Sequence, residues 1–327
     1  MPGRDWVVET DYLGSVGRHL YTVINRNRFA GDLIANQDTL QRLNPYFATI
    51  NYGDNSGASA YSGATISLRK LLSRGISFQT SYTFGKATDV INAPGPGSGS
   101  VYGPVLDAYN ISRQHGLSDN NISQKLAFNF VVELPALASA PAALRYTIGG
   151  WEVSSLAVLQ SGLPATVFTT APFQPVWNLA SCATTVTAAC QVAGNTGGDY
   201  NADGNNFDVP NAPSFGAGKS YSRSQFLQGV FKASDFPAPA LGQEGDLGRN
   251  VFRGPGLAQV DLSLIKNFKI PWFAHESGKL QIRGEFYNLL NRVNLTGFDT
   301  NLTDGTFGQA TSTFTPRSVQ FVARIEF

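Results

Sequence analysis

The sequence predicts an all-β protein that folds as an antiparallel transmembrane β-barrel. Three observations predict this fold class. Apolar and polar residues alternate in many segments, several segments run for about ten residues, and short turns alternate with long polar loops. Because neighbouring side chains of a strand point to opposite faces, this alternation gives each segment one apolar and one polar face.

The alternation is clearest in the last residues of the chain. Val319, Phe321 and Ile325 fall on one face, whereas Gln320 and Arg324 fall on the other. Six further segments show the same period of two. They are residues 64–69, 76–84, 125–134, 151–160, 259–264 and 280–287.

Segment length favours a barrel over a soluble β-sandwich, which also alternates. A strand usually has about five or six residues, whereas a strand that crosses a bilayer needs about 9–11. Aromatic residues lie near segment ends, as Tyr82 and Phe84 do, where they would form girdles at the membrane–water interfaces. The polar face is then expected to line a wet lumen.

The connections between segments are unequal in length. The turn at residues 73–75 is short, whereas long polar loops are predicted at about residues 25–57, 86–120 and 165–255. Short turns at one end of the strands and long loops at the other are typical of outer-membrane barrels.

Composition excludes several classes of protein. The formal net charge of +1 gives no electrostatic reason to expect a nucleic acid partner. Only 14% of the residues are charged, against about 25% in an ordinary soluble domain. No run of about 18 apolar residues is present, so no transmembrane helix is predicted. Residues 1–6 lack the basic start and apolar core of a signal peptide, so the chain is expected either to be cytoplasmic or to lack its beginning.

Four blocks of sequence resemble one known family. They are residues 61–86, 149–164, 247–256 and 261–291. The most specific block reads LGRN and then FRGPG, and the sequence RGEFYNLLN follows it. In these blocks the chain is similar to the TonB-dependent receptors, in particular to Oar-like outer-membrane barrels.

The resemblance implies an outer-membrane receptor that takes up a large ligand with TonB-coupled energy. It spans residues 1–327 but corresponds to the C-terminal part of such a protein, roughly ten strands of a larger plugged barrel. The signal peptide, the regulatory-like domain and the plug are then expected to be missing. Contact with the TonB system would be made only through the missing N-terminal region.

The same resemblance implies a location and two further partners. The chain is expected in the cell outer membrane of a Gram-negative bacterium, in contact with outer-membrane lipid. Its final residue, Phe327, matches the terminal aromatic residue that such barrels present to the barrel-assembly machinery.

One segment matches the start of a calcium-binding loop. Asp199, Asn201 and Asp203 stand at alternate positions before a glycine, as the oxygen ligands of that pattern do. The acidic twelfth position of the pattern is Pro210 here, and Asp208 lies two positions earlier. The alternative interpretation is an Asx-type turn in a polar loop. Calcium is the one cofactor that the sequence suggests.

The two cysteines, Cys182 and Cys190, lie close together in the sequence. They are expected to form a small disulfide loop in an oxidising compartment, and the alternative is two unpaired thiols. Because no histidine accompanies them, a zinc site is not predicted.

No catalytic residues are predicted, so the chain is not expected to be an enzyme. His19, His115 and His275 are far apart and have no metal-ligand partners at helical or strand spacing. The sequence also contains no Gly-x-Ser-x-Gly elbow and no phosphate-binding loop. The turn at residues 254–256 is interpreted as backbone geometry before a strand.

Several charged residues of the predicted lumen face are candidates for substrate contact. The alternative is that they are solvated or paired with neighbouring strands. They are Arg69, Lys125, Glu152, Arg283 and Glu285. Ligand selection is expected in the long loops instead.

A different class of function is also compatible with the pattern. The chain could be a secreted all-β module that binds carbohydrate or serves in adhesion, which membrane fractionation would distinguish from a barrel. For the receptor, the family resemblance leaves oligosaccharide, peptide and iron chelate as alternative ligands.

Overall fold

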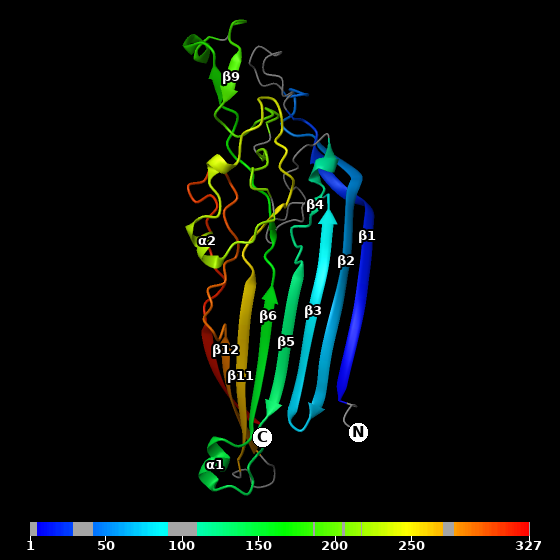
Figure 1. Cartoon of the computed structure of the whole chain (residues 1–327), viewed down its shortest axis with the longest axis vertical. Helices are drawn as coiled ribbons and strands as arrows, with labels where there is room; N and C mark the ends of the chain where they lie inside the picture. Colours follow the sequence, from blue (N-terminus) through cyan, green and yellow to red (C-terminus); the bar gives the residue numbers. More distant parts are fainter. Residues whose placement is uncertain are drawn as a thin grey trace.

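A computed structural model describes residues 5–28, 42–90, 110–185, 187–204, 207–216, 218–270 and 278–326. One large sheet dominates the fold (Figure 1). Its long strands are β1 (Trp6–Asn25), β2 (Asn51–Ser73), β3 (Ile76–Asp89), β5 (Gln124–Glu133), β6 (Trp151–Gln160), β11 (Leu257–Ile270), β12 (Gly278–Tyr287) and β13 (Ser318–Glu326). No helix among these described residues is both long and apolar enough to span a membrane.

The strands follow one another in the sheet in chain order. The order is β1-β2-β3-β5-β6-β11-β12-β13, and the two-residue strand β4 (Gly116–Leu117) pairs with β3, which makes nine strands in all. Every pair of neighbours is antiparallel. In the described residues the sheet is open between β1 and β13. The prediction of an all-β antiparallel fold is confirmed.

The registers put the apolar residues of successive strands on the same face of the sheet. Ile66 of β2 lies opposite Tyr82 of β3, and that tyrosine lies opposite Leu126 of β5. One residue along, Thr65 lies opposite Thr83 on the other face, with 2.9 Å between their hydroxyl oxygens. The alternation that predicted the strands therefore continues across the sheet and gives it one apolar and one polar face.

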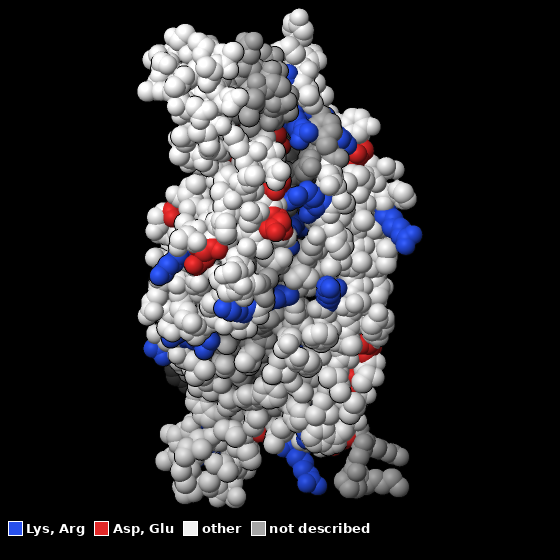
Figure 2. All heavy atoms as spheres, turned by 45° about the horizontal axis from the view of Figure 1, so that its top comes forward, with Lys and Arg blue, Asp and Glu red and all other residues white. Residues whose placement is uncertain are grey.

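Charge is distributed unevenly along the length of the strands. In the face seen in Figure 2, the basic and acidic residues gather over the half of the molecule that carries the long loops. The other half of this face is mostly uncharged down to its rim. Such a band is what a barrel wall presents to the hydrocarbon of a bilayer.

The first strand was not predicted from the alternation. In β1 the polar face carries Val7 and Leu13, which pair with Arg69 and Gly63, so the period of two is blurred. The register also shifts at His19, whose φ of 55° marks a bulge. Backbone pairing with β2 forms this strand despite its weak pattern.

Two strands extend into residues that were predicted to belong to the long loops. Strand β2 already begins at Asn51, and β3 continues to Asp89, within the loops predicted at residues 25–57 and 86–120. The extension of β2 is rich in Gly and Asn, and the extension of β3 has one apolar residue, so backbone hydrogen bonds to the neighbouring strands hold both in the sheet. The strands are therefore longer than the length that alternates.

Short connections lie at one end of the sheet (Figure 1). Arg74 and Gly75, with φ of 54° and 75°, form the turn between β2 and β3, as the short spacing predicted. At the same end lies α1 (Ala142–Thr147), between β5 and β6. Lys266 of β11 is buried on the apolar face there, and its Nζ donates to the carbonyl oxygens of Tyr146 and Gly149, at 2.6 and 2.7 Å.

The long loops contain the remaining elements, at the opposite end of the sheet (Figure 1). They are the strands β7 (Pro164–Ala165), β8 (Pro175–Trp177), β9 (Val192–Asn195) and β10 (Phe252–Arg253), the helix α2 (Arg223–Gln228), and the 3-10 helices η1 (Ile111–Gln114), η2 (Ala180–Ala183) and η3 (Ala233–Asp235). The predicted loop at residues 165–255 thus has a folded structure of its own.

Candidate functional site

The long loops pack into a small body with its own core. We call the segments 161–173, 197–256 and 288–317 the loop body, and the segment 174–196 the disulfide hairpin. Phe231 lies at the centre of the loop body and is 4% exposed, with ring centroids of Phe252, Phe236 and Phe298 at 4.8, 5.4 and 5.6 Å. The full set of buried apolar residues in this core is Val167, Val209, Phe231, Phe236, Leu247, Phe252 and Phe307.

A buried arginine fastens the loop body to the sheet. Arg249 is 5% exposed, and its guanidinium contacts Oδ1 of Asp89 at 2.5 Å and Oδ1 of Asp119 at 3.0 Å. The same group donates to the carbonyl oxygen of Gln114 at 3.1 Å. Asp89 is the last residue of β3, so this one side chain joins the wall, the loop after β3 and the loop body. Such charge-assisted bonds are about twice as strong as neutral ones.

The next residue completes this connection. Asn250 has a φ of 58°, a left-handed conformation that Asn adopts more readily than most residues. Its Nδ2 donates to the carbonyl oxygen of Leu117 at 2.7 Å and to Oδ1 of Asp119. Its backbone N–H donates to Oγ1 of Thr166 at 2.8 Å. Arg249 and Asn250, which we call the latch, therefore attach the loop body to the sheet. They belong to a sequence block that resembles a family signature, and the sequence pattern alone did not reveal this role.

Two chain segments cross closely just below the latch. A Cβ atom on Gly162 would lie 1.8 Å from the carbonyl oxygen of Gly254, so only glycine fits at this crossing. Arg253 donates to the carbonyl oxygen of Gly162 at 3.1 Å. The turn at residues 254–256 precedes β11, in agreement with its interpretation as backbone geometry before a strand.

A cavity of about 440 Å³ lies between the loop body and the upper ends of β6 and β11. Gln160 and Leu257, which are register partners on the polar face, line its floor. The apolar part of its wall includes Leu163, Phe168, Phe207, Phe298 and Phe314, and the polar part includes Gln114, Asp119, Thr166, Arg249 and Asn250. A mostly apolar cavity with a few converging polar groups is typical of a ligand site.

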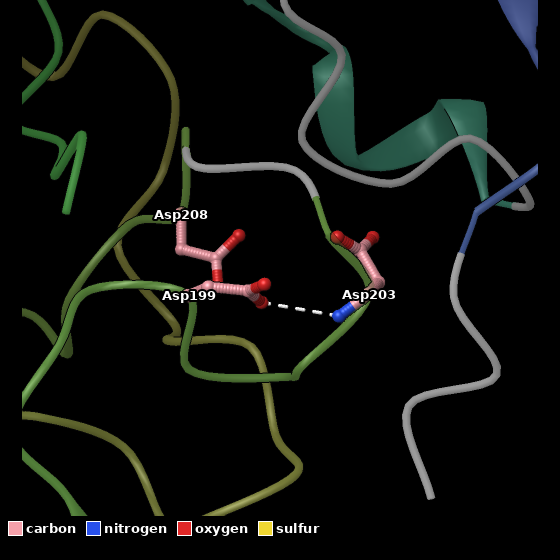
Figure 3. Close-up of side chains that lie close together, drawn as sticks. All are labelled: Asp199, Asp203 and Asp208. Atoms are coloured by element: carbon pink, nitrogen blue, oxygen red, sulfur yellow. Dashed lines mark hydrogen bonds between the residues drawn. The ribbon is translucent and has the colours of Figure 1, made fainter. Parts of the chain in front are cut away.

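Three aspartates converge inside the loop body. Asp199, Asp203 and Asp208 are 2%, 4% and 0% exposed, and their carboxylate oxygens lie within 4.8 Å of one another. Figure 3 shows the carboxyl groups of Asp199 and Asp208 close together, with Asp203 on the facing segment. The sequence placed Asp199 and Asp203 in a calcium pattern and gave no role to Asp208, which the fold brings to the same point.

A tight turn presents the first two of these aspartates. The backbone N–H groups of Asp203 and Gly204 each donate to the carboxylate of Asp199, both at 3.0 Å. The backbone N–H of Asp203 also donates to Oδ1 of Asn201 at 2.9 Å. These contacts form the Asx-type turn that was the alternative interpretation. The turn and the calcium pattern use the same residues, so they do not exclude each other.

A fourth acidic residue joins the cluster from a distant segment. Glu244 accepts hydrogen bonds from Nδ2 of Asn201 at 2.8 Å and from the backbone N–H of Val209 at 3.1 Å. Burial raises the pKa of Asp208 to about 9, and the nearby Glu244 and Asp199 carboxylates raise it as well. Burial and the neighbouring Asp203 raise the pKa of Asp199 to about 6. The cluster is therefore an electrostatically unfavourable place for several anions.

The other candidate residues predicted from the sequence lie outside the aspartate cluster. Cys182 and Cys190 form a disulfide in the hairpin, with 5.7 Å between their Cα atoms. On the polar face, Arg283 pairs with Glu285 at 3.2 Å along the same strand. Phe327 and His275 lie outside the described residues.

The amphipathic sheet, its open polar face and the loops at one end define a membrane β-barrel wall. The chain matches the family described as outer membrane beta barrel domain over residues 3–320, and it belongs to this family. It is accordingly an outer-membrane protein. No curated protein matches the chain.

Comparison with solved structures finds the outer membrane transporter YddB from Escherichia coli. The TM-score is 0.43 at 10% sequence identity, and the match covers 99% of this chain and 30% of that one. The chain thus spans less than a third of the transporter's length.

Proposed function

We propose that the chain forms wall and ligand-binding loops of an outer-membrane receptor that imports a large ligand with energy coupled through TonB. The observation that carries this proposal is the cavity under the loop body, at the upper end of the polar face, in a member of an outer-membrane barrel family. Its other support is the resemblance of the sequence to Oar-like receptors.

The orientation follows from the unequal connections. In outer-membrane barrels the short turns face the periplasm and the long loops face the outside. With that orientation, the loop body lies at the cell surface and α1 lies on the periplasmic side. A ligand from the medium then meets the loop body and its cavity before it reaches the polar face.

The charged residues of the polar face have a secondary part in this proposal. Arg69, Lys125, Glu152, Arg283 and Glu285 would line the route of the ligand, with outer-membrane lipid against the opposite face. The Arg283–Glu285 pair lies along β12, at 3.2 Å. We assign selection of the ligand to the cavity and assign no catalytic step to any residue.

The alternative of a secreted binding module is less well supported. Membership of an outer-membrane barrel family favours an integral wall over a soluble sandwich. An exposed apolar face over the length of several strands would also be a severe aggregation hazard in a secreted protein.

Growth experiments in the host bacterium test the proposal. Strains that lack this gene or a working TonB protein are grown on single oligosaccharides, peptides or ferric chelates as limiting nutrients. We expect one nutrient to fail in both strains. A nutrient that fails only in the gene deletion would contradict TonB coupling, and no failing nutrient would contradict uptake.

A matched pair of variants tests the cavity. Thr300 lines the cavity, whereas Thr303 is exposed outside it. Thr300→Trp should abolish use of the nutrient identified above, and Thr303→Trp should leave it unchanged. Equal growth of the two variants would remove the cavity from the proposal.

A further inference from the structure

The cluster of Asp199, Asp203 and Asp208 contains two carboxyl groups, those of Asp199 and Asp208, whose burial calls for a compensating partner. Asp199 and Asp208 form no ion pair within the described residues. Both are at most 2% exposed, so water cannot solvate their charges. Buried carboxylates in proteins are paired, protonated or bound to a metal. For Asp199 and Asp208, pairing with a cationic side chain is not found in the described part of the chain.

One oxygen atom of the cluster is without any partner. The Oδ2 atom of Asp208 accepts from the backbone N–H groups of Tyr200 and Asn201. Its Oδ1 atom is buried and has no hydrogen-bond partner in the described part of the chain. The carboxyl group of this fully buried side chain is directed at the other two aspartates (Figure 3). An acceptor in this state is costly unless a ligand contacts it.

The donor atoms identify the kind of ligand. All the groups are carboxylate or amide oxygens, with no histidine or thiol among them, which favours a hard cation over zinc. The Ca–O distance is about 2.3–2.6 Å, so ligands on opposite sides of a calcium ion lie about 5 Å apart. Each of the three carboxylates offers an oxygen atom within 4.8 Å of the others, close enough for one calcium ion to contact all three. Magnesium demands near-ideal octahedral geometry and usually keeps several of its water ligands, so a set made of protein oxygens favours calcium.

We propose that Asp199, Asp203 and Asp208 bind one calcium ion, with Asn201 and Glu244 completing its oxygen environment. Asp208 then takes the part of the acidic ligand that the sequence pattern lacks at Pro210. The hydrogen bonds that the carboxylates already accept leave a second lone pair on each oxygen for the ion.

The position of the ion gives it a structural effect. Glu244 lies three residues before Leu247, whose backbone N–H donates to the carbonyl oxygen of Pro210 at 3.2 Å. The ion therefore ties the turn at residues 199–204, together with Asp208, to the segment that leads directly into the latch at Arg249. Calcium at the millimolar concentrations of external media keeps the loop body folded against the wall.

Calcium titration of the full chain, refolded in detergent micelles and freed of metal with EGTA, tests the proposal. Isothermal titration calorimetry should show one saturable site with a dissociation constant of about 10⁻⁴–10⁻³ M or tighter, as in extracellular modules. Asp208→Asn should weaken binding at least tenfold. The control Asp246→Asn removes the same charge from an exposed residue of the same segment and should change the affinity less than twofold.

A second measurement guards against variants that fail to fold. Limited proteolysis of the wild-type loop body should become at least tenfold slower on adding calcium, and magnesium at the same concentration should protect far less. If the wild-type chain shows no saturable binding up to about 10 mM calcium, well above the range of extracellular calcium sites, the proposal is overturned. Equal protection by magnesium, or equal loss of affinity in both variants, would overturn it as well.

Discussion

The wall and the loop body belong to one chain but are stabilised in different ways. In the wall, large apolar side chains face outward, and Tyr12 and Phe321 are 76% and 77% exposed. In the loop body, Phe231 is 4% exposed and surrounded by other aromatic rings. The wall thus depends on lipid as the partner of its apolar face, whereas the loop body carries its own core.

Charged residues differ between the two regions in the same way. The ion pair between Arg324 and Glu326 in β13 leaves these side chains 67% and 43% exposed. The pair between Arg249 and Asp89 leaves them 4% and 12% exposed. Surface pairs contribute little to stability, but removing one partner of a buried pair leaves an uncompensated charge. Single substitutions should therefore be far more damaging in the loop body than on the wall.

The largest effect is expected at the centre of the loop core. Phe231→Ala removes a ring that contacts several other aromatic residues, and should lower the free energy of unfolding of the loop body by about 4 kcal/mol. Pulse proteolysis in urea measures this loss. The control Phe314→Ala, at a residue 48% exposed, should cost less than about 1 kcal/mol. Equal losses would mean that the loop body has no core of its own.

A smaller loss is expected from the latch. Arg249→Ala leaves Asp89 and Asp119 without their shared cation and should destabilise the attachment of the loop body by about 3 kcal/mol. The matched substitution on the wall, Arg324→Ala, should cost at most about 1 kcal/mol. Hydrogen exchange of the backbone amides near residues 114–119 reports the loss. Unchanged exchange in the Arg249 variant would contradict the latch.

The stability of the wall should depend on which face of the sheet carries a substitution. Leu264 lies on the apolar face of β11 opposite Gly284, and Ser263 lies on the polar face opposite Glu285. In lipid vesicles Leu264→Arg should destabilise the sheet by about 2–3 kcal/mol more than Ser263→Arg, because only the first places a charge in hydrocarbon. Urea unfolding followed by heat-modifiable gel mobility compares them. A greater loss for the Ser263 variant would mean that the faces are reversed.

The sequence predicted most of the wall because its signal is local. A period of two is visible within the ten residues of β5 or of β12 alone, whichever strands they pair with. Strand β1 was missed because Val7 and Leu13 interrupt its polar face and its register shifts at His19. Buried Lys266 on the apolar face was also unforeseen, since its partners are carbonyl groups of the loop that contains α1.

The loop body was predictable only in part because its contacts are between distant residues. Asp199, Asn201 and Asp203 form a recognisable pattern within five positions of the sequence. Glu244 contacts Asn201 across a separation of 43 residues, and no local pattern announces such a pair. The role of Arg249 was hidden for the same reason, since Asp89 lies 160 residues away. Side-chain packing in the folded loops determines both contacts.

The smallest effect is expected in the disulfide hairpin, which projects from the loop body (Figure 1). Replacing both Cys182 and Cys190 with Ser opens a loop with a sequence separation of 8 and should cost about 2 kcal/mol locally. Proteolysis within residues 175–195 should become faster, while the cleavage rates around Phe231 stay the same. This result would show that the hairpin and the loop body unfold separately. Faster cleavage throughout the loop body would instead make the disulfide part of the same cooperative unit as the aromatic core.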